Sequence, residues 1–216
     1  MGSVSDGFLT AGGTVIHVCS GPWRPGAYSE YLKAMNIHCF DIDFIIDVKF
    51  NLCVNSFWDG LRKDTSDGKY DGMQADPQCS TFSVLRSRAG GPAPLRDAHA
   101  PGRYGRKLLS DDQQKQVQLD NLLAARVAEL AKILYDMNRP FVIENPAMRP
   151  VQVSIFNLDE YQQLATLAGV EITTFPQCPM GSYSMTPTTV MHYLLKLMAS
   201  ISLMIALLPV VTPPYL

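Results

Sequence analysis

The sequence predicts an α/β fold, with a mostly parallel sheet and helices on both of its faces. Short apolar runs alternate along the chain with amphipathic segments of helical periodicity, which is typical of a parallel sheet built through helical crossovers. The chain has 216 residues and no visible internal repeat, which suits one domain. Hydrophobic residues make up 47% and charged residues 18%, so a packed core is expected and wholesale disorder is excluded.

The expected strands are short runs rich in β-branched or aromatic residues. They cover residues 15–18, 37–40, 45–48, 70–75, 141–143 and 170–175. The expected helices carry apolar residues at spacings of three and four. They cover residues 27–35, 57–63, 111–135 and 158–168. The longest helix has capping chemistry at Ser110 and Asp111, and the segment Asn138-Arg139-Pro140 stops it.

The two ends of the chain differ from its middle. Residues 1–14 lack the basic-then-apolar order of a signal peptide, so we expect a flexible N-terminus before a domain over residues 15–190. Residues 191–216 are mostly apolar, but the uninterrupted part after Lys196 is short for a bilayer span. This tail fits a core or interface helix better than a membrane anchor, and the truncated or misread end of a longer protein is a third interpretation.

The cysteines suggest a reducing compartment. There are five of them, with no CxxC pair and no ligand spacing shared with histidine: Cys19, Cys39, Cys53, Cys79 and Cys178. An odd count without such a framework is typical of free thiols. We therefore expect an intracellular protein, nuclear or cytoplasmic, that holds no metal.

Three expected strands end in residues useful for binding or catalysis. Gly21 and Gly26 follow the first strand, Cys79 follows the strand ending at residue 75, and Glu144 follows the strand ending at residue 143. The carboxyl ends of parallel strands meet at one edge of a sheet, so these residues are expected to converge on one crevice.

Each of these residues also has a simpler interpretation. The Gly21–Gly26 loop could admit a nucleotide, with Asp41 or Asp43 binding ribose hydroxyls, or it could be an ordinary turn, because the pattern is not GxGxxG. Cys79 in a polar loop could be a nucleophile or an incidental thiol. Glu144 could act on a substrate or cap nearby amides, although a carboxylate at the end of an apolar strand needs compensation.

Basic residues concentrate in one loop-like stretch, although the formal net charge of the whole chain is −2. Between residues 86 and 107 a single acid, Asp97, faces six basic residues: Arg86, Arg88, Arg96, Arg103, Arg106 and Lys107. The glycines and prolines in this stretch suit either a mobile lid with arginines that contact phosphates or a solvated loop.

Three motifs in order resemble those of the cytosine-5 DNA methyltransferases, especially shortened relatives associated with mobile elements. The segment from Pro77 to Ser83 resembles the family's Pro-Pro-Cys-x-x-Phe-Ser loop. Glu144-Asn145-Pro146 resembles its Glu-Asn-Val/Pro motif. Residues 177–181 with Pro187-Thr188 resemble a late Gln-Cys-x-x-Gly…Lys-Pro-Thr signature. The resemblance covers about residues 15–190.

This resemblance implies a Rossmann-like class I fold that transfers a methyl group from S-adenosylmethionine to a cytosine flipped out of double-stranded DNA. The thiolate of Cys79 would add to cytosine carbon-6, and Glu144 would hold the base. The residues that would lie against the methyl donor are Ser20, Gly21, Gly26, Asp41, Asn51 and Pro77. Those that would contact DNA are Ser83, Arg86, Arg88, Arg96 and Asn145.

The chain also departs from the family's motifs. Asp76 and Gln78 replace residues that are small or proline in the family, and Asp76 is expected to raise the pKa of the Cys79 thiol. Asn51 stands where relatives tend to carry an acid, Thr186 stands where a lysine precedes Pro187, and the chain contains no Gln-x-Arg-x-Arg element. Two alternatives therefore stay open: a degenerate homologue that binds S-adenosylmethionine or nucleic acid without turnover, and a membrane- or partner-binding module built on the C-terminal segment.

Overall fold

The computed structural model describes residues 12–23, 25–82, 86, 90–147, 153–176 and 187–193. Several residues that the sequence singles out lie outside these ranges. They are Ser83, Arg88, the 177–181 motif with Cys178, Thr186, most of the N-terminal segment and all but the first three residues of the 191–216 segment.

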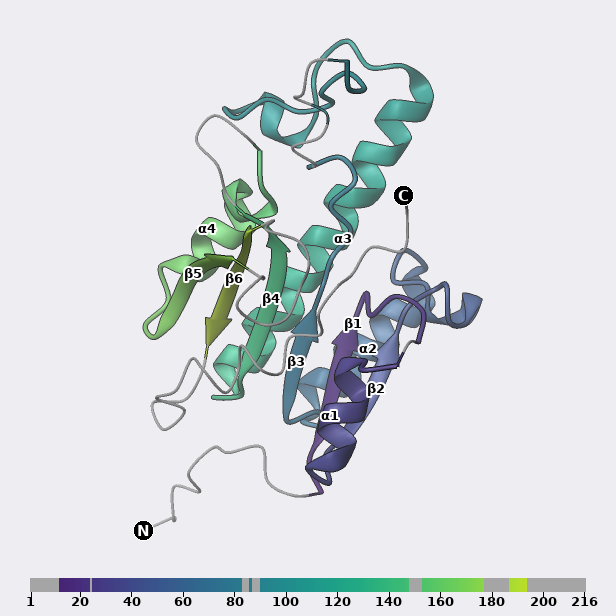
Figure 1. Cartoon of the computed structure of the whole chain (residues 1–216), viewed down its shortest axis with the longest axis vertical. Helices are drawn as coiled ribbons and strands as arrows, with labels where there is room; N and C mark the ends of the chain where they lie inside the picture. The colour runs from purple at the N-terminus through teal and green to yellow at the C-terminus, as the bar shows by residue number, and fades with distance from the viewer. Residues whose placement is uncertain are drawn as a thin grey trace.

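The core of the molecule is one six-stranded sheet with the order β2-β1-β3-β4-β6-β5 (Figure 1). Its strands are β1 (Thr14–Val18), β2 (His38–Ile42), β3 (Gly72–Ala75), β4 (Phe141–Pro146), β5 (Val170–Pro176) and β6 (Pro187–Tyr193). The pairs β2–β1, β1–β3 and β3–β4 are parallel, whereas β6 runs antiparallel to both β4 and β5. The expected α/β class is thus confirmed, but the sheet is mixed rather than mostly parallel.

Two local expectations are wrong. Residues 45–48 form no strand, because Asp43 and Asp47 stabilise turns there: Asp43 accepts the Ile45 N–H, and Asp47 caps the 3-10 helix η1 (Val48–Phe50). Residues 191–193, which we assigned to a possible apolar helix, belong to β6. This strand is buried on both faces and shows no strict alternation of apolar and polar residues, so short-range periodicity could not distinguish it from a helix.

The four expected helices are present. They are α1 (Tyr28–Ala34), α2 (Asn55–Ser66), α3 (Asp111–Asp136) and α4 (Asp159–Ala165), with 3-10 turns η3 (Gly102–Tyr104) and η4 (Ile155–Asn157). The predicted start of α3 is confirmed, because Ser110 and Gln113 form a reciprocal capping box. The chain leaves α3 through Asn138, which has a left-handed backbone with φ of 57°.

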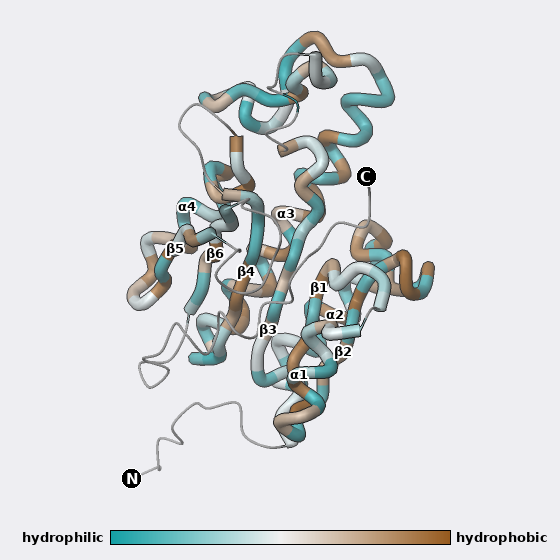
Figure 2. The backbone as a smooth tube through the Cα atoms, in the orientation of Figure 1, coloured by the Kyte–Doolittle hydropathy of each residue, from teal (hydrophilic) through white to brown (hydrophobic). Residues whose placement is uncertain are grey.

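Helices cover both faces of the sheet, as expected. The main hydrophobic cluster joins α2, α3 and α4 to one face through residues such as Ile16, Phe141 and Ile143. A smaller cluster joins α1 to the other face through Val15, Tyr28 and Leu32. Figure 2 shows a further hydrophobic stretch in the loop after β2, where Phe44, Ile45 and Val48 are exposed to solvent.

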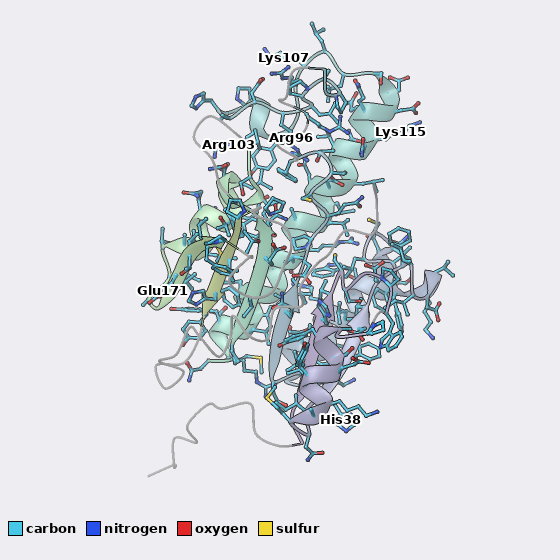
Figure 3. All side chains as sticks on the ribbon, in the orientation of Figure 1. His38, Arg96, Arg103, Lys107, Lys115 and Glu171 are labelled. Carbon is cyan, nitrogen blue, oxygen red and sulfur yellow. The ribbon has the colours of Figure 1, made fainter. Side chains whose placement is uncertain are left out.

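The described part of the basic segment packs at the N-terminal end of α3. Figure 3 shows Arg96, Arg103 and Lys107 gathered there, beside Lys115 of α3. Leu95 and Arg96 are buried, whereas Lys107 is exposed. In the part of the chain that the structure describes, no helix is both long and apolar enough to cross a membrane.

Candidate functional site

The carboxyl end of β1 turns sharply into the glycine loop. Cys19 has a left-handed backbone with φ of 58°, which is uncommon for a residue with a side chain, and Gly21 follows with φ of 67°. The Gly21 N–H donates to Asp43 Oδ2 at 3.0 Å. The acid that follows β2 therefore holds the glycine loop of β1 in place.

A cavity of about 620 Å³ opens beyond the carboxyl ends of β1, β2 and β3. Its walls combine apolar groups from the loop after β2 and from α3 with a few polar groups, including Asp43, Asn51, Gln78 and Asp120. This size and mixed lining are typical of sites for small organic ligands. The cavity lies where an open α/β sheet is expected to bind them.

A much smaller cavity lies beside the glycine loop, with room for about one water molecule. Ser20, Gly21 and Tyr28 contribute to its walls together with His17 and Asp41. Asp76, immediately after β3, lines both the small and the large cavity.

The predicted cofactor residues are divided between these two cavities. Asn51 lines the large cavity, and Ser20, Gly21 and Asp41 line the small one. Gly26 and Pro77 belong to neither lining; the Gly26 N–H donates to Glu30 at 2.7 Å. Of the two acids proposed to face a ribose, the structure places Asp43 at the large cavity and engages Asp41 with a histidine.

That histidine, His17, was not singled out in the sequence. It lies within β1, only 4% exposed, with Nδ1 3.1 Å from Asp41 Oδ1 and Nε2 2.8 Å from Asp76 Oδ2. Burial alone lowers the pKa of His17, but the hydrogen bonds and negative charges of Asp41 and Asp76 raise it to about 9. The only signal in the sequence is a titratable residue inside a β-branched run, with acids at the ends of two other strands.

Cys79 is half-buried in the loop after β3, with a free thiol. Burial raises the pKa of Cys79, and the negative charges of Glu144 and Asp120 raise it further. The thiol at rest is therefore protonated at neutral pH, and a change in the charge of Glu144 alters its reactivity.

Glu144 lies within β4 rather than after it. Burial and the charge of Asp76 raise the pKa of Glu144 to about 7, although a hydrogen bond from Thr188 of β6 opposes the shift. The next residue, Asn145, donates through its side-chain amide to the Pro77 carbonyl at 3.0 Å. The structure thus brings the Glu144-Asn145 segment against the loop that carries Cys79, as the strand-end argument expected.

The expected effect of Asp76 on Cys79 is not observed. Asp76 Oδ2 is bound to His17, and its Oδ1 accepts a hydrogen bond from Gln74 at 2.7 Å. The carboxylates that raise the pKa of Cys79 are instead Glu144 and Asp120.

The residues after Cys79 are anchored to α3 by the buried Asp120. Its Oδ2 accepts hydrogen bonds from the Ser80 hydroxyl, the Thr81 N–H and the Thr81 hydroxyl. Because Asp120 also lines the large cavity, it connects the cavity wall to the thiol loop.

The position of Arg96 contradicts the expectation that this arginine belongs to a mobile lid and contacts phosphates. Arg96 is 4% exposed, and its guanidinium donates to the Thr81 hydroxyl at 2.9 and 3.0 Å and to Asn121 at 2.7 Å. The same group stacks 3.7 Å from the centroid of the Phe82 ring. Arg96 therefore holds the segment together and is not available to a phosphate. Arg86 is also engaged, donating to the Ser80 carbonyl at 2.9 Å.

Comparison with known proteins assigns this chain to no family. No protein-family model matches this sequence, and no curated protein is significantly similar to it.

Proposed function

We propose that this chain is a Rossmann-like methyltransferase domain that binds S-adenosylmethionine in the large cavity and presents Cys79 to a cytosine of DNA. The observation that carries the proposal is that Gln78, the neighbour of Cys79, lines the large cavity, whereas Cys79 and Glu144 lie behind that wall and outside the lining. Asp120 lines the cavity and anchors Ser80 and Thr81, and Asn145 ties the other side of the loop to β4.

The topology supports the proposal. A last strand that inserts antiparallel between the two preceding strands, at the edge of an otherwise parallel sheet, is typical of class I methyltransferases. Here β6 occupies that position between β4 and β5. The cavity lies at the carboxyl ends of the strands on the parallel side of the same sheet.

The cavity also fits an adenosine-containing ligand in its chemistry. Phe44, Ile45 and Phe50 offer apolar and aromatic surface for a base, while Asn51 and Asp43 offer a side-chain amide and a carboxylate for polar edges or ribose hydroxyls.

The electrostatics of Cys79 and Glu144 suit addition to a cytosine. A carboxyl group with a pKa of about 7 can donate a proton to a ring nitrogen and take one back at neutral pH. When Glu144 is protonated, its charge no longer opposes the Cys79 thiolate, so a bound base that keeps Glu144 protonated makes the nucleophile more reactive. The thiolate would then add to carbon-6, and carbon-5 would take the methyl group of S-adenosylmethionine, which would leave as S-adenosylhomocysteine. Loss of the carbon-5 proton to solvent would then break the carbon-6–sulfur bond and release the Cys79 thiolate.

One observation favours a second candidate, a domain that binds the cofactor or nucleic acid without turnover. The pKa of Cys79 is raised by three causes at once, namely burial and the charges of Glu144 and Asp120, and in the described residues no cation lowers it. Binding in the large cavity does not require an activated thiol.

Calorimetric titration with S-adenosylmethionine tests the shared part of both candidates. Binding that Asp43→Ala and Asn51→Ala weaken by roughly tenfold or more, while the exposed α3 variant Gln118→Ala does not, supports the proposed cavity. Absence of binding to S-adenosylmethionine and to S-adenosylhomocysteine by the folded wild-type protein overturns both methyltransferase candidates.

Trapping on duplex DNA that contains 5-fluorocytosine separates the two candidates. With the methyl donor present, an active enzyme forms a covalent adduct that Cys79→Ala abolishes and Cys39→Ser retains, because Cys39 lies under α1 and away from the large cavity. Cofactor binding without any adduct selects the inactive binder.

A further inference from the structure

The register of β1 and β2 places three metal-binding side chains on one face of the sheet. His17 is paired directly with Asp41, and Cys39 lies two residues before Asp41, so all three side chains point to the same side. This is the side covered by α1, where the Tyr28 ring packs edge-on against the imidazole with centroids 5.3 Å apart. The cluster is therefore mostly shielded from bulk water.

The spacing of the donor atoms fits a tetrahedral ion. His17 Nδ1 and Asp41 Oδ1 are 3.1 Å apart, Cys39 Sγ and Asp41 Oδ1 are 3.7 Å apart, and all the donor atoms lie within 4.8 Å of one another. Zinc bonds of roughly 2.0–2.3 Å at tetrahedral angles separate nitrogen from oxygen by about 3.3 Å and sulfur from oxygen by about 3.6 Å. Two of the three pairs lie within about 0.2 Å of these separations.

A carboxylate also lies where it would orient the histidine ring. A histidine that ligates a metal through one nitrogen usually donates its other N–H to a carboxylate, which fixes the ring. His17 Nε2 lies 2.8 Å from Asp76 Oδ2, and Asp76 is itself held by Gln74. The small cavity, lined by His17 and Asp41, has room for a water molecule as a fourth ligand.

We propose that His17, Cys39 and Asp41 form a binding site for a thiophilic divalent cation, with zinc as the best fit. A nitrogen, a sulfur and an oxygen donor are typical of zinc and exclude magnesium and calcium, which prefer oxygen alone. Coordination replaces the proton on Nδ1 and the proton on the Cys39 thiol, and leaves the Nε2–H bound to Asp76.

The sequence concealed this site because its ligands come from two strands. Cys39 and Asp41 are separated by one residue, and His17 precedes Cys39 by more than twenty, which matches neither the CxxC pair nor the Cys/His spacing on which our expectation of no metal depended. Strand pairing, rather than local spacing, brings them together.

Zinc titration of the metal-stripped protein tests the proposal. One zinc per chain should bind and raise the Tm, because zinc crosslinks β1 and β2 only in the folded state. Cys39→Ser removes a ligand and should weaken zinc binding by more than about 100-fold. Asp76→Asn removes the carboxylate that orients His17 and should weaken zinc binding by roughly 10–100-fold. The matched control, Cys79→Ser, removes a half-buried thiol elsewhere and should bind zinc as the wild type does.

A second readout does not depend on the stability of the variants. Cobalt added to the wild-type protein should give the near-ultraviolet charge-transfer band of a cobalt–thiolate bond, and zinc should slow the alkylation of Cys39 while leaving the alkylation rate of Cys79 unchanged. Zinc binding that survives Cys39→Ser, or cobalt binding without the thiolate band, overturns the proposal. None of these outcomes depends on S-adenosylmethionine binding, so this inference and the proposed function fail separately.

Discussion

The side-chain amide of Asn145 donates a hydrogen bond of 3.0 Å to the carbonyl oxygen of Pro77. Asn145 is 2% exposed and lies in β4, whereas Pro77 lies two residues before Cys79 in the loop after β3. The β3–β4 ladder pairs residues only as far as Ala75 and Ile143. The position of the Cys79 loop over β4 therefore depends on a side chain and not on strand pairing.

Replacing Asn145 with alanine is expected to loosen the loop. The buried Pro77 carbonyl loses its partner, which costs about 1–3 kcal/mol in the free energy of unfolding. Cys79, no longer held in a buried position, should react faster with iodoacetamide under native conditions. Urea unfolding and the rate of alkylation, followed by mass spectrometry, measure both effects. The exposed amide variant Gln118→Ala should change neither, and an unchanged alkylation rate in Asn145→Ala would contradict the role of this bond.

Replacing Glu144 with glutamine is expected to lower the pKa of Cys79. The negative charge of Glu144 is the second cause of the raised pKa, after burial, so its removal favours the thiolate while burial still keeps the pKa above that of a free thiol. The pH at which alkylation of Cys79 reaches half its maximal rate should therefore fall. Glu129→Gln, on the exposed side of α3, is the control. A pH profile that coincides with that of the wild type means that the two groups do not interact.

The stability of the protein should depend on pH through Glu144. Its pKa is about 7 in the folded protein against 4.5 for the free side chain, so the folded state binds the proton more tightly. The resulting stabilisation is complete below about pH 4.5 and is lost as the pH rises to about 7. Relative to Glu144→Gln, the wild type should lose on the order of 2–3 kcal/mol across this range. Chemical unfolding of both proteins at several pH values measures the difference, and parallel profiles would refute it.

Local patterns in the sequence predicted the elements of this fold better than their pairing. The periodicity of residues 111–135 and the capping residues at Ser110 located α3 nearly to the residue. The direction of β6 was not predictable in this way, because its pairing with β4 and β5 is fixed by long-range packing and not by a local pattern.

The same limit applies to the candidate site. Cys79 and Glu144 were identified because each follows or ends an apolar run, which is a local signal. His17 and Asp120 carry no such signal: one is positioned by its strand neighbour Asp41 and the other by the loop it anchors, 39 residues away at Thr81. Charged residues inside an element acquire their roles from tertiary contacts, which a single sequence does not display.

The basic segment offers a test of which cations hold the structure and which are free for a partner. Arg96→Ala leaves the Thr81 hydroxyl and Asn121 without a donor and leaves Asp120 without its nearby positive charge, so the free energy of unfolding should fall by about 2–4 kcal/mol. Arg96→Lys should recover little of this loss, since a lysine cannot reproduce the planar set of hydrogen bonds.

Lys107 is the matched cation on the surface of the same segment. Lys107→Ala should change the free energy of unfolding by no more than about 0.5 kcal/mol. If the exposed cations of the segment contact phosphates, as one interpretation of the sequence has it, this variant should also weaken duplex binding at every sequence and reduce by about 1 the slope of log affinity against log salt concentration. Unfolding curves and fluorescence anisotropy at several salt concentrations measure these effects. An Arg96→Ala protein as stable as the wild type would contradict the structural role of Arg96, and an unchanged salt dependence in Lys107→Ala would exclude Lys107 from the DNA-binding surface.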